Sequence, residues 1–261
     1  MPRHRVRVDV KDLLEEAYAR FATPGFIPDD PIQVPRSFAD PRDAEVIGFL
    51  TATIAWGQRR TIITNAFRLA RMLDDRPASF IRDASEAELD HLDRFVHRTF
   101  QGVDLRYFVK ALRHLVKEHD GLEGAFLQQG RFGYAGEAIS RFKDRFFALE
   151  HPGRTRKHVA DPRRGSNAKR INMFLRWMVR PDDRGVDLGL WKRINASELM
   201  VPLDVHTGRV ARDLGLLKRG QDDWKSVVEL TEKLRQLDPH DPVRFDLALF
   251  GLGVSGGDLS P

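Results

Sequence analysis

Positively charged side chains gather in one segment of the chain, where they could bind phosphate groups. Residues 151–180 hold nine lysine and arginine residues and a single acidic one, Asp161, whereas the whole chain has a net charge of +5. Such a basic segment is typical of a nucleic-acid-binding surface, although a solvated surface without a partner has the same composition. We expect phosphate contacts from Arg154, Arg156, Lys157, Arg163, Arg164, Arg170 and Arg176, and from the backbone N–H groups of Gly165 and Ser166.

Lys169 and Asp204 have side chains that could act on a bound molecule. Lys169 opens an amphipathic helix whose apolar residues recur with helical spacing over residues 171–178, while Arg176 and Arg180 lie on an opposite, cationic face. Asp204 has the position of an N-cap for the helix that follows it. A lysine on a helix surface and an aspartate at a cap are also ordinary structural residues, so a structural role stays open for both.

The composition excludes several classes of protein. The chain has no cysteine, which rules out disulfides, thiolate-bound metals and a cysteine nucleophile. His206 has no second ligand at a supporting spacing, so we expect no metal and no cofactor. There is no glycine-rich nucleotide loop and no Ser-His-Asp signature. No apolar run reaches about 18 residues and the first ten residues lack a signal-peptide core, so we expect a cytoplasmic protein without membrane contact.

The periodicity of apolar residues predicts an all-α fold. Residues 46–56 are apolar nearly all round, which places that helix in the interior. Asp40 precedes it as a cap-like residue. The predicted helices cover residues 13–21, 45–73 with interruptions at Gly48 and Gly57, 85–96, 105–118, 137–149, 169–180, 188–199 and 205–215. Residues 24–35 and 151–165 are predicted to be irregular, and Val6, Val8 and Val10 to form an extended arm.

The segment around Asp204 resembles the catalytic segment of helix-hairpin-helix DNA glycosylases. Residues 202–215, PLDVHTGRVARDLG, are similar to that family's pattern P-x-D-T-H-V-x-R followed by an apolar helix, with Val205 and Thr207 where Thr and Val are usual. The resemblance implies that Asp204 is catalytic and that His206 is structural. We expect Arg209, at the end of the pattern, to contact DNA.

Almost the full chain also resembles the DUF2400 family of bacterial proteins. The resemblance rests on AWGQR at residues 55–59, KALRHL at 110–115, GLE at 121–123, KRINMFLRWMVR at 169–180, the Asp204 segment and DPVRFDLALFGLG at 241–253. By itself it implies no function.

Among the glycosylases, the archaeal 8-oxoguanine enzymes are the most similar. Like them, the chain has a lysine that opens a helix ahead of the aspartate, here 35 positions earlier (204 minus 169), and a final helix with Asp246 and Phe250. Where these enzymes have Leu-Pro-Gly-Val-Gly before the lysine, residues 164–168 are Arg-Gly-Ser-Asn-Ala. The resemblance implies an HhH-GPD-like fold in which DNA lies in a groove between two helical subdomains, residues 41–180 and residues 1–40 with 181–261.

The resemblance implies a DNA glycosylase with AP-lyase activity in base-excision repair, acting on a damaged base such as an oxidised purine and associated with the nucleoid. The amine of Lys169 would displace the base and form a Schiff base, and the neighbouring arginines would favour its neutral form. Asp204 would stabilise the positive charge that develops on the sugar.

A base that leaves the duplex needs a pocket with a stacking ring and a residue that fills the gap. Trp56 and Phe250 could stack, Gln58 and Arg59 could fill the gap, and Asp246 could bind a base edge, although the aromatic rings also suit a core. Two alternatives stay open: a DNA- or RNA-binding protein without activity, and a monofunctional glycosylase that uses Asp204 and water. The oligomeric state has no signal in the sequence.

Overall fold

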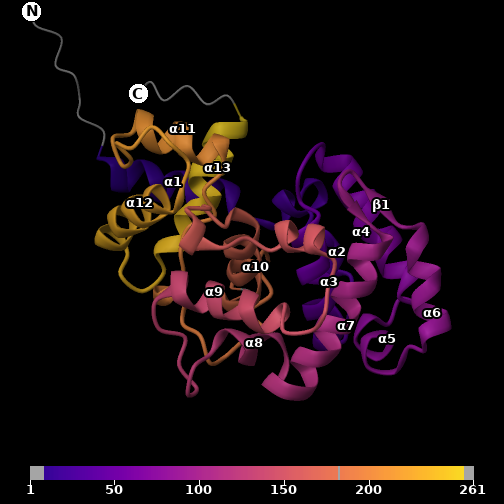
Figure 1. Cartoon of the computed structure of the whole chain (residues 1–261). Coiled ribbons are helices and arrows are strands. Elements are labelled where there is room, and N and C mark those ends of the chain that lie inside the picture. Colours follow the sequence, from indigo (N-terminus) through magenta and orange to yellow (C-terminus); the bar gives the residue numbers. More distant parts are fainter. Residues whose placement is uncertain (1–8, 182, 256–261) are drawn as a thin grey trace, which may run out of the picture.

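The protein is built from helices joined by loops, as a computed structural model of residues 9–181 and 183–255 shows (Figure 1). The all-α fold is therefore confirmed. The helices are α1 (Val10–Phe21), α2 (Gln33–Arg36), α3 (Pro41–Thr53), α4 (Arg59–Met72), α5 (Pro77–Asp83), α6 (Glu86–His91), α7 (Gly102–His119), α8 (Gly121–Phe126), α9 (Ala135–Phe146), α10 (Lys169–Val179), α11 (Val205–Asp213), α12 (Trp224–Leu237) and α13 (Phe245–Val254). Val6 and Val8 of the predicted arm lie outside the described residues, and Val10 begins α1.

A short hairpin is the one β-sheet in the described part of the chain. Strand β1 (Val96–His97) pairs antiparallel with β2 (Phe100–Gln101). The prediction of a single helix over residues 85–96 is therefore wrong in its second half. The chain turns back there because Phe95 and Phe100, which flank the hairpin turn, are both completely buried in the core.

The remaining regular structure consists of 3₁₀ turns in the connections between helices. They are η1 (Pro24–Asp29), η2 (Leu92–Arg94), η3 (Gly153–His158), η4 (Pro162–Arg164), η5 (Ala196–Glu198) and η6 (Pro242–Arg244). Two of them divide the basic stretch at residues 151–165, which was predicted to be irregular.

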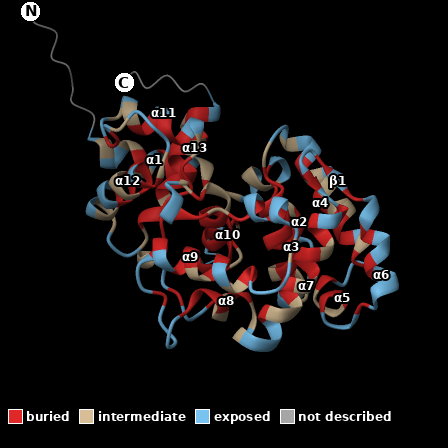
Figure 2. Cartoon of the chain, in the orientation of Figure 1, coloured by how far each residue is buried: buried red, intermediate tan, exposed pale blue. Residues whose placement is uncertain are grey.

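Helix α3 lies in the middle of the core, as its uniformly apolar sequence predicted. Asp40 caps it by accepting the N–H of Arg42, and the helix is buried from Val46 to its end (Figure 2). A Cβ at Gly48 would lie 2.9 Å from the terminal methyl of Met178, so the absence of a side chain allows α10 to approach closely. The ring of Phe49 contacts those of Phe142 and Phe174, which ties α3 to both α9 and α10.

The prediction of a helix over residues 188–199 is wrong. The backbone N–H groups of Leu188 and Trp191 donate instead to carbonyl oxygens at the end of α10, at 2.8 Å each. The indole of Trp191 is 5% exposed, lies edge-on to Phe174 and donates to Glu45 in α3 at 2.6 Å. Contacts with α3 and α10 therefore override the local periodicity, and only η5 remains helical in this segment.

The chain's early and late segments lie together. Helix α1 packs against α13, and α13 against α11, on one side of Figure 1, whereas α4 to α7 lie on the other side and α10 lies between them. Helix α2 contacts both predicted subdomains, because it packs against α3 and α4 while Arg36 donates to the carbonyls of Val186 and Asp187. No helix of the described residues combines the length and the apolar character of a membrane span.

Candidate active site

A pocket of about 670 Å³ lies where α10, α11 and α13 meet the loops that precede α2 and α4. A volume of this size suits a small ligand or a single nucleobase with its sugar. Of the residues expected to act in catalysis, DNA binding or base binding, the following line it: Trp56, Arg59, Lys169, Arg170, Arg176, Asp204, Asp246 and Phe250. Residues far apart in the chain therefore meet in one cavity.

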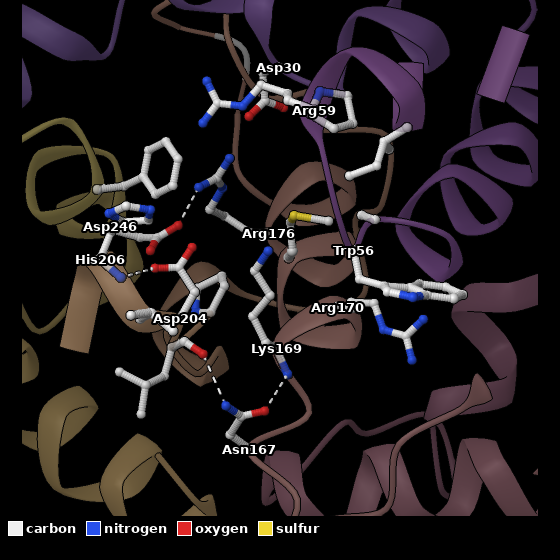
Figure 3. A pocket seen from close by; sticks show the side chains of 18 of the residues that line it. Asp30, Trp56, Arg59, Asn167, Lys169, Arg170, Arg176, Asp204, His206 and Asp246 are labelled. Carbon is white, nitrogen blue, oxygen red and sulfur yellow. Dashed lines mark hydrogen bonds and ion pairs between the residues drawn. The ribbon is translucent and has the colours of Figure 1, made fainter. Parts of the chain in front are cut away.

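Lys169 is the first residue of α10, and the turn before it is strained. Ala168 aligns with the last glycine of the Leu-Pro-Gly-Val-Gly pattern compared above. Its φ is 49°, in the left-handed region that favours glycine. Gly165 is also left-handed, with a φ of 81°. The chain thus turns sharply into α10, and the Lys169 side chain extends into the pocket (Figure 3).

Asn167 connects the two segments that carry Lys169 and Asp204. Its side-chain oxygen accepts the N–H of Lys169 at 3.3 Å, and its amide donates to the carbonyl of Leu203 at 3.1 Å (Figure 3). Since Leu203 directly precedes Asp204, this single side chain fixes the start of α10 relative to the start of α11.

Asp204 is the N-cap of α11 and also lines the pocket. Its Oδ1 accepts the N–H groups of His206 and Thr207, each at 2.9 Å. Within the described residues, its other oxygen has no hydrogen-bond partner. The structural role and a role toward a ligand are therefore compatible, because the cap uses one oxygen and leaves the second one available.

The prediction of an exposed cationic face on α10 is wrong, because other elements cover this face. Asn172, Arg176 and Arg180 are all buried. The guanidinium of Arg176 pairs with Asp187 at 3.2 Å and with Asp246, and Arg180 pairs with Asp187 and with Asp241 at 2.8 Å. Arg176 is thus part of a buried ion-pair network at the wall of the pocket and is not a surface contact for phosphates.

The charges around Lys169 consequently differ from the expected ones. Asp30, Asp204 and Asp246 line the same pocket, and the positive charge of Arg176 is balanced by its carboxylate partners. Burial raises the pKa of Asp246 to about 6. The Arg176 guanidinium lowers this pKa, and the Asp204 carboxylate raises it further. The cavity therefore contains acidic groups in addition to the predicted basic ones.

Trp56 is half-buried at one end of the pocket and is held on several sides. The guanidinium of Arg170 lies 4.8 Å from its ring centre, and the imidazoles of His97 and His158 lie at 5.1 and 6.1 Å. Arg170 donates to the carbonyls of Thr53 and His158, and burial lowers its pKa to about 10. Arg170, which we expected to contact phosphate, therefore packs against the ring of Trp56 and is not exposed on the surface.

Phe250 also borders the pocket. Arg59 places its guanidinium 5.3 Å from the ring centre of Phe250, and the rings of Phe26 and His206 meet this phenyl ring edge-on, each at 6.0 Å. Gln58 is exposed at the start of α4 and does not line the cavity.

The other predicted phosphate ligands lie outside the pocket. Arg154 and Arg163 are held by acidic side chains, Asp104 and Asp144 respectively. Arg209 donates to the carbonyl of Gly253 at 2.7 Å. The exposed residues are Arg154, Arg156, Lys157, Arg163, Arg164, Gly165 and Arg209, whereas Ser166 is half-buried. The exposed side chains among them are available to a large polyanion, and none of them lines the cavity.

Several pocket residues were not predicted, among them Asp30, Asn167 and Asp222. Asp30 lies in the loop between η1 and α2, and Asn167 precedes Lys169. In the sequence, Asp30 is one of two consecutive aspartates in a proline-rich connection, and no spacing connects it with α10. Among the described residues, no group of His, Asp or Glu side chains is arranged to hold a metal ion.

The chain belongs to the DUF2400 family, described as a protein of unknown function, whose family model matches residues 30–255. The match covers every residue that lines the pocket except Phe26 in η1. No curated protein and no solved structure matches the chain.

The buried network predicts a large loss of stability when Arg176 is replaced. Arg176→Met has a side chain of similar length but removes a partner from both Asp187 and Asp246, so we expect the free energy of unfolding to fall by about 3–5 kcal/mol. Urea denaturation at neutral pH measures it. The matched control is Arg82→Met, which breaks an exposed pair with Asp83 and should cost about 0–1 kcal/mol. Equal losses in the two variants would contradict a structural role for the network.

Proposed function

We propose that the protein is a DNA glycosylase with AP-lyase activity, which removes a damaged base through a Schiff base on Lys169. The observation that carries this proposal is that the Lys169 amine and the Asp204 carboxylate, from the starts of two different helices, line one cavity. Two aromatic side chains, Trp56 and Phe250, border the same cavity. This is the set of groups that excision of an extrahelical base requires.

In the proposed reaction, the base leaves the duplex and enters the pocket, with its deoxyribose between Lys169 and Asp204. As the bond between C1′ and the base breaks, the carboxylate oxygen of Asp204 that is not used by the cap stabilises the positive charge on the sugar. The amine nitrogen of Lys169 forms a bond to C1′, the base departs with the electron pair of the broken bond, and the departing base takes up the proton that the bonded nitrogen loses.

The lyase step follows from the same bond. Ring opening of the sugar converts the adduct to a protonated Schiff base, which makes a hydrogen on C2′ acidic. Loss of that proton and departure of the 3′-phosphate cleave the strand by β-elimination, and water then releases the amine of Lys169. The step needs no oxidant and no cofactor.

Exposed cations in the segment before Lys169 support binding to a polyanion. Lys157 and Arg164 are exposed and, within the described residues, have no acidic partner, in contrast to Arg154 and Arg163. They lie in the segment that leads into Lys169. A phosphate backbone that contacts them would pass close to the entrance of α10.

Borohydride trapping tests the proposal. The wild-type protein is incubated with oligonucleotides that contain an abasic site, 8-oxoguanine, uracil or hypoxanthine, reduced, and digested for mass spectrometry. We expect a covalent adduct on the peptide that contains Lys169. Base release without an adduct would favour a monofunctional glycosylase that uses Asp204 and water, and salt-dependent binding without either would favour a nucleic-acid-binding protein without activity.

A further inference from the structure

Asp30 is a buried carboxylate with one unused oxygen at the wall of the pocket. Its exposed fraction is 9%, and its Oδ1 accepts the N–H of Ile32 at 2.9 Å. Within the described residues, Oδ2 has no hydrogen-bond partner. The other acidic side chain deep in the pocket differs, because Asp246 uses one oxygen for Arg176 and the other for the hydroxyl of Thr207. Asp30 therefore offers a free acceptor that Asp246 does not.

Arg59 supplies donors at the same end of the pocket. It is half-buried, and its guanidinium contacts the ring of Phe250 but has no hydrogen-bond or ion-pair partner in the described part of the chain. The positive charge of Arg59 lowers the pKa of Asp30. Figure 3 shows both side chains at the end of the pocket away from Asn167. A carboxylate only accepts and a guanidinium only donates, so the pair has a defined polarity.

On the basis of the proposed function, we propose that Asp30 and Arg59 select bases with a lactam edge, a ring N–H next to a carbonyl. Oδ2 of Asp30 accepts the ring N–H, and the guanidinium of Arg59 donates to the neighbouring carbonyl oxygen. The substrate class is then hypoxanthine, uracil and modified bases that keep this edge. In the same orientation, adenine, cytosine and lesions that keep their amidine edge place a ring acceptor against the carboxylate, and leave the buried Asp30 and the half-buried Arg59 unpaired.

The ionised form of Asp30, on which the proposal depends, has to be stabilised against burial. Burial raises the pKa of Asp30, whereas the hydrogen bond from the N–H of Ile32 lowers it, as do the positive charges of Arg176, Arg59 and Lys169. A donor N–H from the ligand adds a further interaction with the ionised form. A ligand that presents an acceptor has no such effect and repels the carboxylate.

Equilibrium binding tests the proposal with pairs of bases that differ at this edge. The probes are oligonucleotides with hypoxanthine or adenine, and uracil or cytosine, each placed opposite an abasic analogue so that no base pair has to be broken. A 2′-fluoroarabino sugar protects the glycosidic bond, so the wild-type protein can be used. We expect hypoxanthine to bind about 100-fold more tightly than adenine, and uracil more tightly than cytosine.

Asp30→Asn is the decisive variant. Its amide oxygen keeps the hydrogen bond from Ile32, so the loop is preserved, while the amide nitrogen replaces the free acceptor by a donor. We expect the preference for hypoxanthine to fall at least tenfold, because adenine now meets a donor. Asp29→Asn removes the same charge at an exposed neighbouring position and should keep the wild-type preference. Arg59→Met should weaken hypoxanthine binding more than adenine binding.

The outcomes separate this inference from the proposed activity. No preference in the wild type, or a preference that Asp30→Asn leaves unchanged, overturns the inference even if abasic sites form an adduct with Lys169. A preference that depends on Asp30 without any adduct supports base selection and overturns the lyase assignment alone. Equal effects of Asp29→Asn and Asp30→Asn would show a general charge effect and overturn the inference.

Discussion

Replacing Lys169 with alanine is expected to abolish the borohydride-trapped adduct and to lower strand cleavage at abasic sites by about 10³-fold or more. The reason is that Lys169 is the one lysine among the described residues that line the pocket. The measurement is single-turnover cleavage of an abasic oligonucleotide, together with trapping on the same substrate. Binding should persist, because the exposed cations lie outside the cavity.

Lys157→Ala is the matched control for this prediction. Lys157 is an exposed lysine in the basic segment that precedes α10 and does not line the pocket. Its loss should weaken binding and reduce the salt dependence by about one phosphate contact, while the adduct still forms at saturating protein. An adduct of wild-type yield in Lys169→Ala would refute the assignment of the nucleophile.

Replacing Asp204 with asparagine is expected to lower the rate of base release by about 10²- to 10³-fold. The amide keeps the steric size of the carboxylate but cannot stabilise positive charge on the sugar. Asparagine is also a good N-cap, so its side-chain oxygen can still accept the N–H groups of His206 and Thr207 and the thermal unfolding temperature should change little.

Asp204→Ala separates the two roles of this residue. It removes the cap as well as the charge, so we expect the same loss of base release together with a stability loss of about 1 kcal/mol. Single-turnover release of free base and thermal denaturation measure the two effects. If Asp204→Asn released the base at the wild-type rate, Asp204 would be a cap and nothing more.

The helices were predictable where local periodicity and packing agree. Helices α3, α7 and α9 lie close to the predicted segments, and the caps Asp40 and Asp204 are in place. Residues 188–199 have a helical pattern, but backbone hydrogen bonds to the end of α10 and the burial of Trp191 stabilise an extended path instead. These contacts join segments that are distant in sequence, so a prediction from local sequence does not take them into account.

The site was predictable only in part, for a similar reason. Lys169 and Asp204 are in recognisable motifs, and both line the pocket. Arg176 was misjudged because helical spacing shows which residues share a face, whereas it does not show that Asp187 and Asp246 cover that face. Asp30 and Asn167 are in loops without a motif, and their positions depend on the tertiary fold.

The contact between α1 and α13 has a consequence for the order in which the molecule can fold. During synthesis α1 leaves the ribosome long before α13, so its apolar face stays without a partner while the intervening helices form. Contacts between such distant segments are slow to form because a long loop must close. Helix α13 also carries Asp246 and Phe250, so the cavity gains its last wall late, after the core around α3 has already assembled.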